Sequence, residues 1–174
     1  KMNKIYDALI ELDERRAAEH RLPLVWKSAG RSCNLSIGTY HAGGCASNVA
    51  GMAEMECRIG FVPGESGKDI VAEVENTIMD VAKKDDWLRE HPPEVEWYGS
   101  DTEPWQQDVD NPFVKAFLAS SAVVLGKEPE VLGFPGGLDT RFAAYFDTFV
   151  WLYGRYVATD SYYSHGFLIP FICG

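Results

Sequence analysis

The chain has 174 residues, of which 46% are apolar and 24% are charged, and its formal net charge is −10. The length suits one domain or two small ones with a hydrophobic core, and the composition excludes a disordered segment. The acidic balance, with no run of Lys or Arg, argues against nucleic acid and anionic membranes as partners. The chain has no apolar stretch of the roughly 20 residues that a spanning helix needs and no signal peptide, so we expect a cytoplasmic protein.

The first residues predict a helix and then a loop. Apolar residues recur at helical spacing over residues 2–19, which predicts an amphipathic helix with one stripe on a core. Near its end, Arg15 and Arg16 alternate with acids, and we interpret them as part of a solvated helix face. Residues 20–33, with Pro23 and mixed polarity, predict a loop.

Two strands follow, joined by a Gly-rich turn. Alternating side chains predict a strand over residues 34–41 and a second one at about 52–62. We expect Cys57 on the buried face of the second strand. The opposite face is predicted to carry its charged residues, Glu54, Glu56 and Arg58.

A second helix and a short strand complete this part of the chain. Ser66 and Asp69 resemble a helix-starting capping box, and apolar spacing continues the helix to about Lys84. Residues 94–98 predict a short strand. The order helix, strand, strand, helix, strand predicts a two-layer α/β sandwich with an antiparallel sheet, in the ferredoxin-like order without its leading strand. We assign residues 1–99 to this domain.

Residues 100–174 are predicted to form part of a second, α/β domain. Polar residues around 99–110 predict a crossing between domains. Asn111-Pro112 predicts the start of a helix that Gly126 ends. A Gly-rich turn at 133–137, a short helix from Asp139 and a strand at 148–153 follow in the prediction.

An ordered series of motifs resembles the cocatalytic zinc amidohydrolases that include acetylornithine deacetylase, succinyl-diaminopimelate desuccinylase, aminoacylase and carboxypeptidase G. The motifs are the Gly43-Gly44 turn, Asn48, residues 53–58 ending in Arg58, Pro63-Gly64-Glu65, residues 136–142, Tyr153-Gly154 and His165-Gly166. The resemblance covers nearly the whole chain in order. It implies that residues 1–99 are a lid and dimerisation domain, and that 100–174 are the C-terminal part of a catalytic domain.

The resemblance also implies roles for four residues. Asn48 would lie near the reacting carbonyl, Arg58 would bind a substrate carboxylate, Asp139 would line the substrate side and His165 would ligate zinc. The family enzyme holds two zinc ions, and its other ligands, a His-x-Asp, a bridging Asp and a Glu-Glu pair, are not in this chain.

Each of these residues also has a simpler interpretation. Arg58 is flanked by Glu54 and Glu56 and could form a cross-strand ion pair. Asn48 is a common residue in turns, Asp139 suits a helix N-cap, and His165 could be a surface histidine. The residues alone leave these alternatives open.

The sequence therefore predicts part of a zinc-dependent hydrolase that cleaves the amide bond of N-acyl amino acids or small peptides and forms a homodimer through its lid. Because most metal ligands are missing, the chain alone is expected to be inactive. The alternative is a stand-alone α/β module for dimerisation or small-ligand binding, without catalysis.

Overall fold

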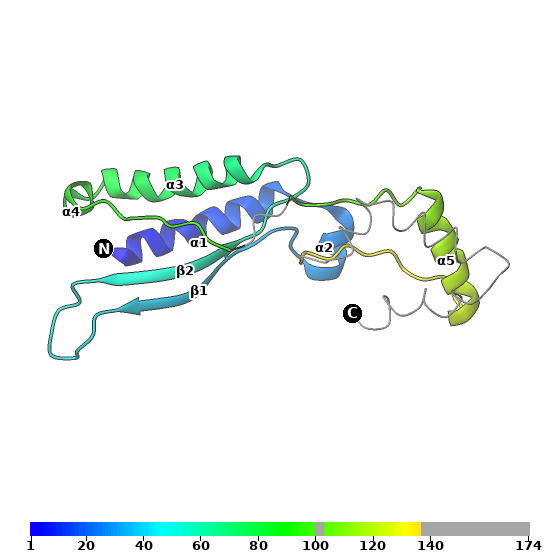
Figure 1. Cartoon of the computed structure of the whole chain (residues 1–174), viewed down its shortest axis with the longest axis horizontal. Coiled ribbons are helices and arrows are strands. Elements are labelled where there is room, and N and C mark those ends of the chain that lie inside the picture. Colours follow the sequence, from blue (N-terminus) through cyan, green and yellow to red (C-terminus); the bar gives the residue numbers. More distant parts are fainter. Residues whose placement is uncertain (100–102, 137–174) are drawn as a thin grey trace. The chain divides into compact units, whose positions relative to one another are not determined.

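A computed structural model describes residues 1–99 and 103–136 of the chain. The chain divides into two compact units (Figure 1). The first comprises Lys1–Pro104 with Leu132–Pro135, and the second comprises Trp105–Val131 with Gly136–Gly174. The predictions for Asp139, His165 and the strand at 148–153 lie outside the described residues.

The first helix, α1 (Met2–Glu19), confirms the predicted amphipathic helix. Its buried stripe runs through Ile5, Leu9 and Leu12 and continues to Arg16, four residues further on. The stripe packs against the strand that follows and against helix α3. Helix α1 therefore contributes buried side chains to the core of the first unit and contacts both β1 and α3.

The loop predicted over residues 20–33 is wrong in part, because it contains helix α2 (Pro23–Ala29). Pro23 occupies the first turn, where a missing N–H costs nothing. Gly30 ends the helix in the left-handed conformation, with φ 72°. These residues are start and stop signals, but the seven residues between them are too few to show a helical apolar pattern.

Residues Leu132–Pro135 return to the first unit and lie against α2. The Gly133 amide donates to the Leu24 carbonyl at 3.1 Å, and the Ser28 hydroxyl donates to the Gly133 carbonyl at 2.5 Å. A Cβ atom at position 133 would clash with the Val25 side chain and lie 2.8 Å from its backbone nitrogen. The contact therefore requires glycine.

The two predicted strands form an antiparallel hairpin of β1 (Leu35–Ala42) and β2 (Ala53–Ile59). Strand β2 ends at Ile59, three residues before the predicted end. Its Cys57, expected to be buried, is exposed. The ladder pairs Cys57 with Ile37, next to a bulge between Ile37 and Thr39. The thiol faces the helix side, but the packed core includes its neighbours Met55 and Ile59 and not this shorter side chain.

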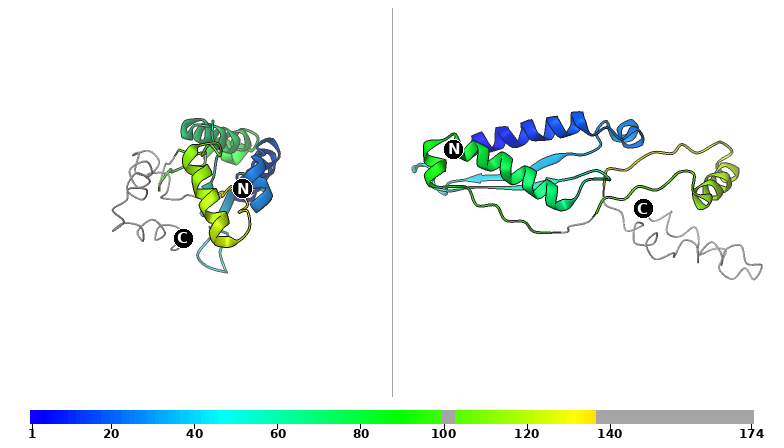
Figure 2. Two further views of the ribbon diagram at one scale, coloured as in Figure 1. Left: turned by 90° about the vertical axis from the view of Figure 1, so that its right-hand side faces the viewer. Right: turned by 90° about the horizontal axis from the view of Figure 1, so that it is seen from above.

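Helix α3 (Gly67–Lys83) begins at the predicted cap, where the Ser66 hydroxyl accepts from the Asp69 amide at 3.2 Å. It lies beside α1 on the same face of the hairpin (Figures 1 and 2), so the first unit is a two-layer α/β structure, as predicted. The buried cluster between the layers consists of Ile5, Leu9, Leu12, Leu35, Val74, Ile78, Ala82 and Leu88.

A short helix, α4 (Asp86–Glu90), follows, and Asp85 caps it by accepting from the Trp87 and Leu88 amides at 3.1 and 3.2 Å. The same carboxylate binds Lys4 Nζ at 2.7 Å and Lys1 Nζ at 2.9 Å. These two bonds lower the pKa of Asp85 far below its usual range. Asp85 thus joins α4 to the start of α1.

The strand predicted over residues 94–98 is absent from this described segment, which is not part of a ladder. Val95 packs on the core, while the Trp97 ring nitrogen donates to Glu75 at 2.9 Å. A strand needs a neighbour for its backbone groups, and here the segment is held by side chains only.

Helix α5 (Pro112–Leu125) belongs to the second unit and has the predicted bounds. The Asn111 side chain accepts from the Phe113 amide at 2.9 Å, and Gly126 ends the helix with φ 67°. Val123 and Val124 are more than 80% exposed. None of the described helices is both long enough and apolar enough to span a membrane.

Candidate substrate-binding face

The helices cover one face of the β1–β2 hairpin (Figures 1 and 2). The other face carries polar side chains. Side chains alternate between the faces of a strand, and residues opposite each other in the ladder share a face. We call the uncovered side the polar face. It carries Ser36, Thr39, His41, Glu54, Glu56 and Arg58. All but the half-buried Thr39 are exposed.

Arg58 lies opposite Ser36 at the end of the hairpin far from its connecting loop. Its guanidinium forms no ion pair or hydrogen bond with any described residue. The cross-strand ion pair with Glu54 or Glu56, which the sequence left open, is therefore not formed. An exposed guanidinium in this state has its full set of donors available.

Glu56, the nearest acid on the polar face, is engaged elsewhere. One carboxylate oxygen accepts from the Thr39 hydroxyl at 2.9 Å, and the other accepts from the Tyr98 hydroxyl at 3.0 Å. The bond to Glu56 raises the pKa of Tyr98 above its usual value, because the carboxylate stabilises the protonated phenol. The sequence pattern predicted that Glu56 lies on the polar face of the strand. It could not show that Tyr98, 42 positions away, binds its carboxylate.

Asn48 lies in the loop that joins the two strands, where its amide donates to the Cys45 carbonyl at 3.2 Å. The loop closes through the Gly43 amide and the Met52 carbonyl at 3.0 Å. Asn48 is exposed, and its neighbour Val49 is 96% exposed. The ladder separates Asn48 from Arg58, so the hairpin does not bring these two predicted site residues together.

A buried ion network corrects the interpretation of Arg16 as part of a solvated face. Arg16 is only 3% exposed, and it donates to Glu73 at 2.6 Å and to Glu65 at 2.9 Å. Glu65 also accepts from the Val62 amide at 2.8 Å and lies 3.4 Å from His20. The signal for burial was the helical spacing of Arg16 with Leu9 and Leu12.

The network raises the pKa of Arg16 and lowers the pKa of Glu65, so both groups stay ionised. Burial would lower the pKa of Arg16, but the bonds to Glu65 and Glu73 raise it. Burial would likewise raise the pKa of Glu65, but the bonds from Arg16 and the Val62 amide lower it. Arg16 is thus a buried structural cation that is paired with two carboxylates.

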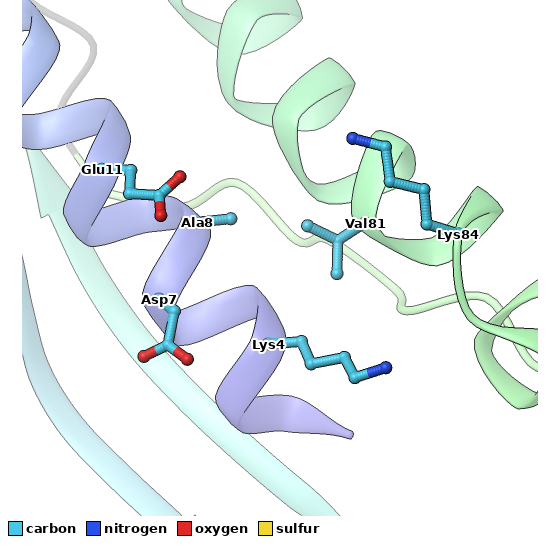
Figure 3. A pocket seen from close by; sticks show the side chains of 6 residues that line it. All are labelled: Lys4, Asp7, Ala8, Glu11, Val81 and Lys84. Atoms are coloured by element: carbon cyan, nitrogen blue, oxygen red, sulfur yellow. The ribbon is translucent and has the colours of Figure 1, made fainter.

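Two hollows lie elsewhere on the first unit. One, of about 310 Å³, is a groove between α1 and α3 (Figure 3). It is lined by Lys4, Asp7, Ala8, Glu11, Val81 and Lys84. The other, of about 550 Å³, lies between α1 and β1 and is lined by residues that include Tyr6 and Tyr40. Neither hollow includes Arg58 or Asn48.

The described residues do not fit a metal ion. Within 1–99 and 103–136, no group of three or more His, Cys, Asp or Glu side chains is placed to hold one. The predicted ligand His165 and the predicted substrate residue Asp139 lie beyond this part of the chain.

One similarity to a characterised protein bears on function. Over 52 residues the chain is 42% identical to the N-formyl-4-amino-5-aminomethyl-2-methylpyrimidine deformylase of Halalkalibacterium halodurans. The matched segment is 30% of this chain and spans only 12% of that protein. No protein-family profile matches the chain. Since a deformylase is a hydrolase, the similarity is a link to hydrolases over a short segment.

Proposed function

We propose that this chain is part of a metal-dependent hydrolase that cleaves the amide bond of N-acyl amino acids or small peptides, and that Arg58 binds the substrate's carboxylate. The similarity to a deformylase supports the reaction class. The observation that carries the binding role is the exposed guanidinium of Arg58, unpaired among the described residues.

The chemistry of Arg58 suits a carboxylate. A guanidinium is planar and permanently charged, and it can hold the two oxygens of a carboxylate with two parallel hydrogen bonds. Glu56 forms no ion pair with Arg58, and its two oxygens accept from Thr39 and Tyr98 instead. Arg58 would therefore orient the amino-acid end of the substrate and leave its acyl end for the reacting groups.

The other parts of the proposal concern the metal ions and the residues near the reacting carbonyl. The two zinc ions would need ligands other than these, with His165 proposed as one of them, and we derive no step through the metal. Asn48 is proposed as a hydrogen-bond donor to the reacting carbonyl and Asp139 as a substrate-side residue.

The proposed homodimer would use the outer edge of β1. In the described part of the chain, β1 pairs only with β2, so its other edge is unpaired. Exposed strand edges readily pair with a second copy, and charged side chains, lysine above all, oppose such pairing. We expect light scattering to give a dimer mass for the wild type and a monomer mass for Tyr40→Lys. A monomeric wild type at high concentration would contradict the dimer.

The carboxylate site is tested by titrating the chain with N-acetyl-L-norleucine and following amide chemical shifts by NMR. The matched ligand is N-acetyl-L-norleucine amide, which lacks the carboxylate. We expect the acid to bind more tightly than the amide, and Arg58→Ala to weaken binding of the acid roughly tenfold, the loss of one charge-assisted hydrogen-bonded contact. Arg58→Lys keeps the positive charge but cannot form the two parallel hydrogen bonds of a guanidinium. Its affinity for the acid should therefore lie between those of the wild type and Arg58→Ala.

Equal affinity of Arg58→Ala and the wild type for the acid would overturn the proposed role of Arg58. A chain that dimerises but binds no N-acyl amino acid would instead favour the stand-alone dimerisation module.

A further inference from the structure

Residues Leu132–Pro135 are anchored on helix α2 between two stretches of chain that belong to the second unit. The segment itself is part of the first unit. Both backbone groups of Gly133 bind the helix. Its amide donates to the Leu24 carbonyl at 3.1 Å, and its carbonyl accepts from the Ser28 hydroxyl at 2.5 Å. We call this segment together with α2 the α2 latch.

The α2 latch lies on the surface of the first unit. Leu132 and Phe134, which flank Gly133, are both exposed, and none of the residues of α2 is buried. Separating the segment from the helix would therefore uncover little apolar surface. A contact of this kind can open locally, at a low free energy, while the core stays folded.

Ser28 has two acceptors for its single hydroxyl proton. Besides the Gly133 carbonyl, the hydroxyl lies 3.0 Å from the carbonyl of Val25, one turn back in its own helix. A hydroxyl donates one hydrogen bond at a time, so it can turn to Val25 when Gly133 leaves. The surface backbone groups of Gly133 can then bind water. Opening therefore leaves neither Ser28 nor Gly133 without partners.

Closure of the α2 latch requires glycine at position 133. A Cβ atom there would lie 2.8 Å from the backbone nitrogen of Val25 and 3.0 Å from its Cα. Because these are backbone atoms of a helix, a change of the Val25 rotamer would not relieve the clash. A substitution at this position should therefore keep the latch open without disturbing the core.

We infer that residues 132–135 close on α2 and open from it as a local conformational device. Its consequence for the site rests on the proposed function, in which Asp139 lines the substrate. Asp139 follows Pro135 by four residues, so their Cα atoms can be no more than about 14 Å apart. A closed latch limits the positions available to Asp139, and an open latch removes that limit. Ser28 and Gly133 are then positioning residues.

The opening is tested by hydrogen exchange of the full chain, followed by NMR at low urea concentrations. Local opening exposes little surface, so the exchange rate of the Gly133 amide should hardly depend on urea. The amide of Ile78, which is buried in the core, should exchange much more slowly and depend on urea steeply. An equally steep dependence at Gly133 would show that it opens only with the whole unit, which would overturn the inference.

Two variants act on the α2 latch itself. Ser28→Ala should speed exchange at Gly133 about two- to threefold, the low end for one hydrogen bond, because the hydroxyl has a second acceptor in the open state. Ser28→Thr keeps the hydroxyl and should remain close to the wild type. Gly133→Ala should abolish protection at position 133 and leave Ile78 protected. Its matched control is Gly44→Ala, where a Cβ atom meets nothing within 4 Å. Retained protection in Gly133→Ala would overturn the latch.

Binding of N-acetyl-L-norleucine tests the positioning role. Gly133→Ala should weaken it several-fold, because the closed state becomes rare, while Gly44→Ala should not. Wild-type affinity in Gly133→Ala would overturn the positioning role. If the wild type does not bind the ligand at all, the proposed function fails, and the exchange rates still decide whether the latch opens locally.

Discussion

Two arginines of the first unit occupy opposite environments. Arg16 lies in the buried network between α1 and α3, with its guanidinium bound to both Glu65 and Glu73. Arg58 lies on the polar face of the hairpin, beside acids, and binds neither. Both follow an acid-rich stretch of sequence, so the local composition does not distinguish them.

The difference teaches where a charged side chain contributes to stability and where it is available for a ligand. A buried guanidinium needs its partners, because an unpaired charge in the core is costly. An exposed guanidinium gains little from a neighbouring acid and can remain unpaired. Arg16 is therefore expected to matter for folding and Arg58 for binding, and the following substitutions test that division.

The largest effect is expected for Arg16→Met. It would leave Glu65 without its guanidinium partner and Glu73 with Arg15 alone, in a mostly buried site, at a cost of about 3 kcal/mol or more in the free energy of unfolding. The matched control is Arg15→Met, since Arg15 also binds Glu73, at 2.9 Å, but its side chain is half exposed. That variant should lose less than about 1 kcal/mol. Urea denaturation followed by circular dichroism measures the stability of both variants. Equal losses for Arg16→Met and Arg15→Met would contradict the structural role assigned to the buried Arg16.

A second, smaller effect is expected for Asp13→Asn. Asp13 is buried, and its two oxygens accept from the Leu35 amide at 2.6 Å and from Arg31 at 2.8 Å. Losing the charge should lower the free energy of unfolding by about 1–2 kcal/mol. Both hydrogen bonds weaken, and the side-chain nitrogen of the introduced asparagine has no acceptor. Glu14→Gln is the control, because Glu14 pairs with Arg31 at 3.3 Å but is largely exposed. If Asp13→Asn and Glu14→Gln shift the urea midpoint equally, the buried bonds of Asp13 do not contribute more to stability than the exposed pair of Glu14.

The buried network also predicts a pH dependence of stability. The folded pKa of Glu65 lies below its usual value of 4.5, so the unfolded chain binds the proton more readily. The stabilisation is therefore fully present above that usual value and is lost as the pH falls through the lowered folded pKa. Urea midpoints measured across this window should fall with pH, and less steeply in Glu65→Gln. An unchanged slope in the variant would show that other groups carry the dependence.

The smallest change in stability is expected for Arg58→Ala. Exposed substitutions away from special features usually change the free energy of unfolding by no more than about 0.5 kcal/mol. The same variant should lose affinity for N-acetyl-L-norleucine, as proposed above. A large loss of stability in urea denaturation would show that Arg58 has a structural partner and would remove the contrast with Arg16.

Most of the first unit could be predicted from sequence because its elements have local signals. The apolar stripe of α1, the alternation in β1 and the cap at Ser66 each depend on residues a few positions apart. Helix α2 was missed because it is short. The segment at 94–98 has strand chemistry, but a ladder depends on a neighbour that its own sequence does not specify.

The candidate site was predictable only in part, for a similar reason. Alternation along β2 identified Arg58 and its two acidic neighbours as sharing one face. Tyr98, which binds Glu56, lies 42 positions away from it, and Glu65 and Glu73, which bind Arg16, lie 49 and 57 positions away from Arg16. Such long-range partners leave no periodic signal in either segment.

The bonds that Asp85 makes have a consequence for the kinetics of folding. They connect positions separated by 84 and 81 residues, so the chain must close a long loop before either bond forms. The same carboxylate also accepts from the first amides of α4. That short helix should therefore order late, when the start of α1 reaches it. Hydrogen exchange at the Leu88 amide would then report the opening of the whole first unit rather than local fraying.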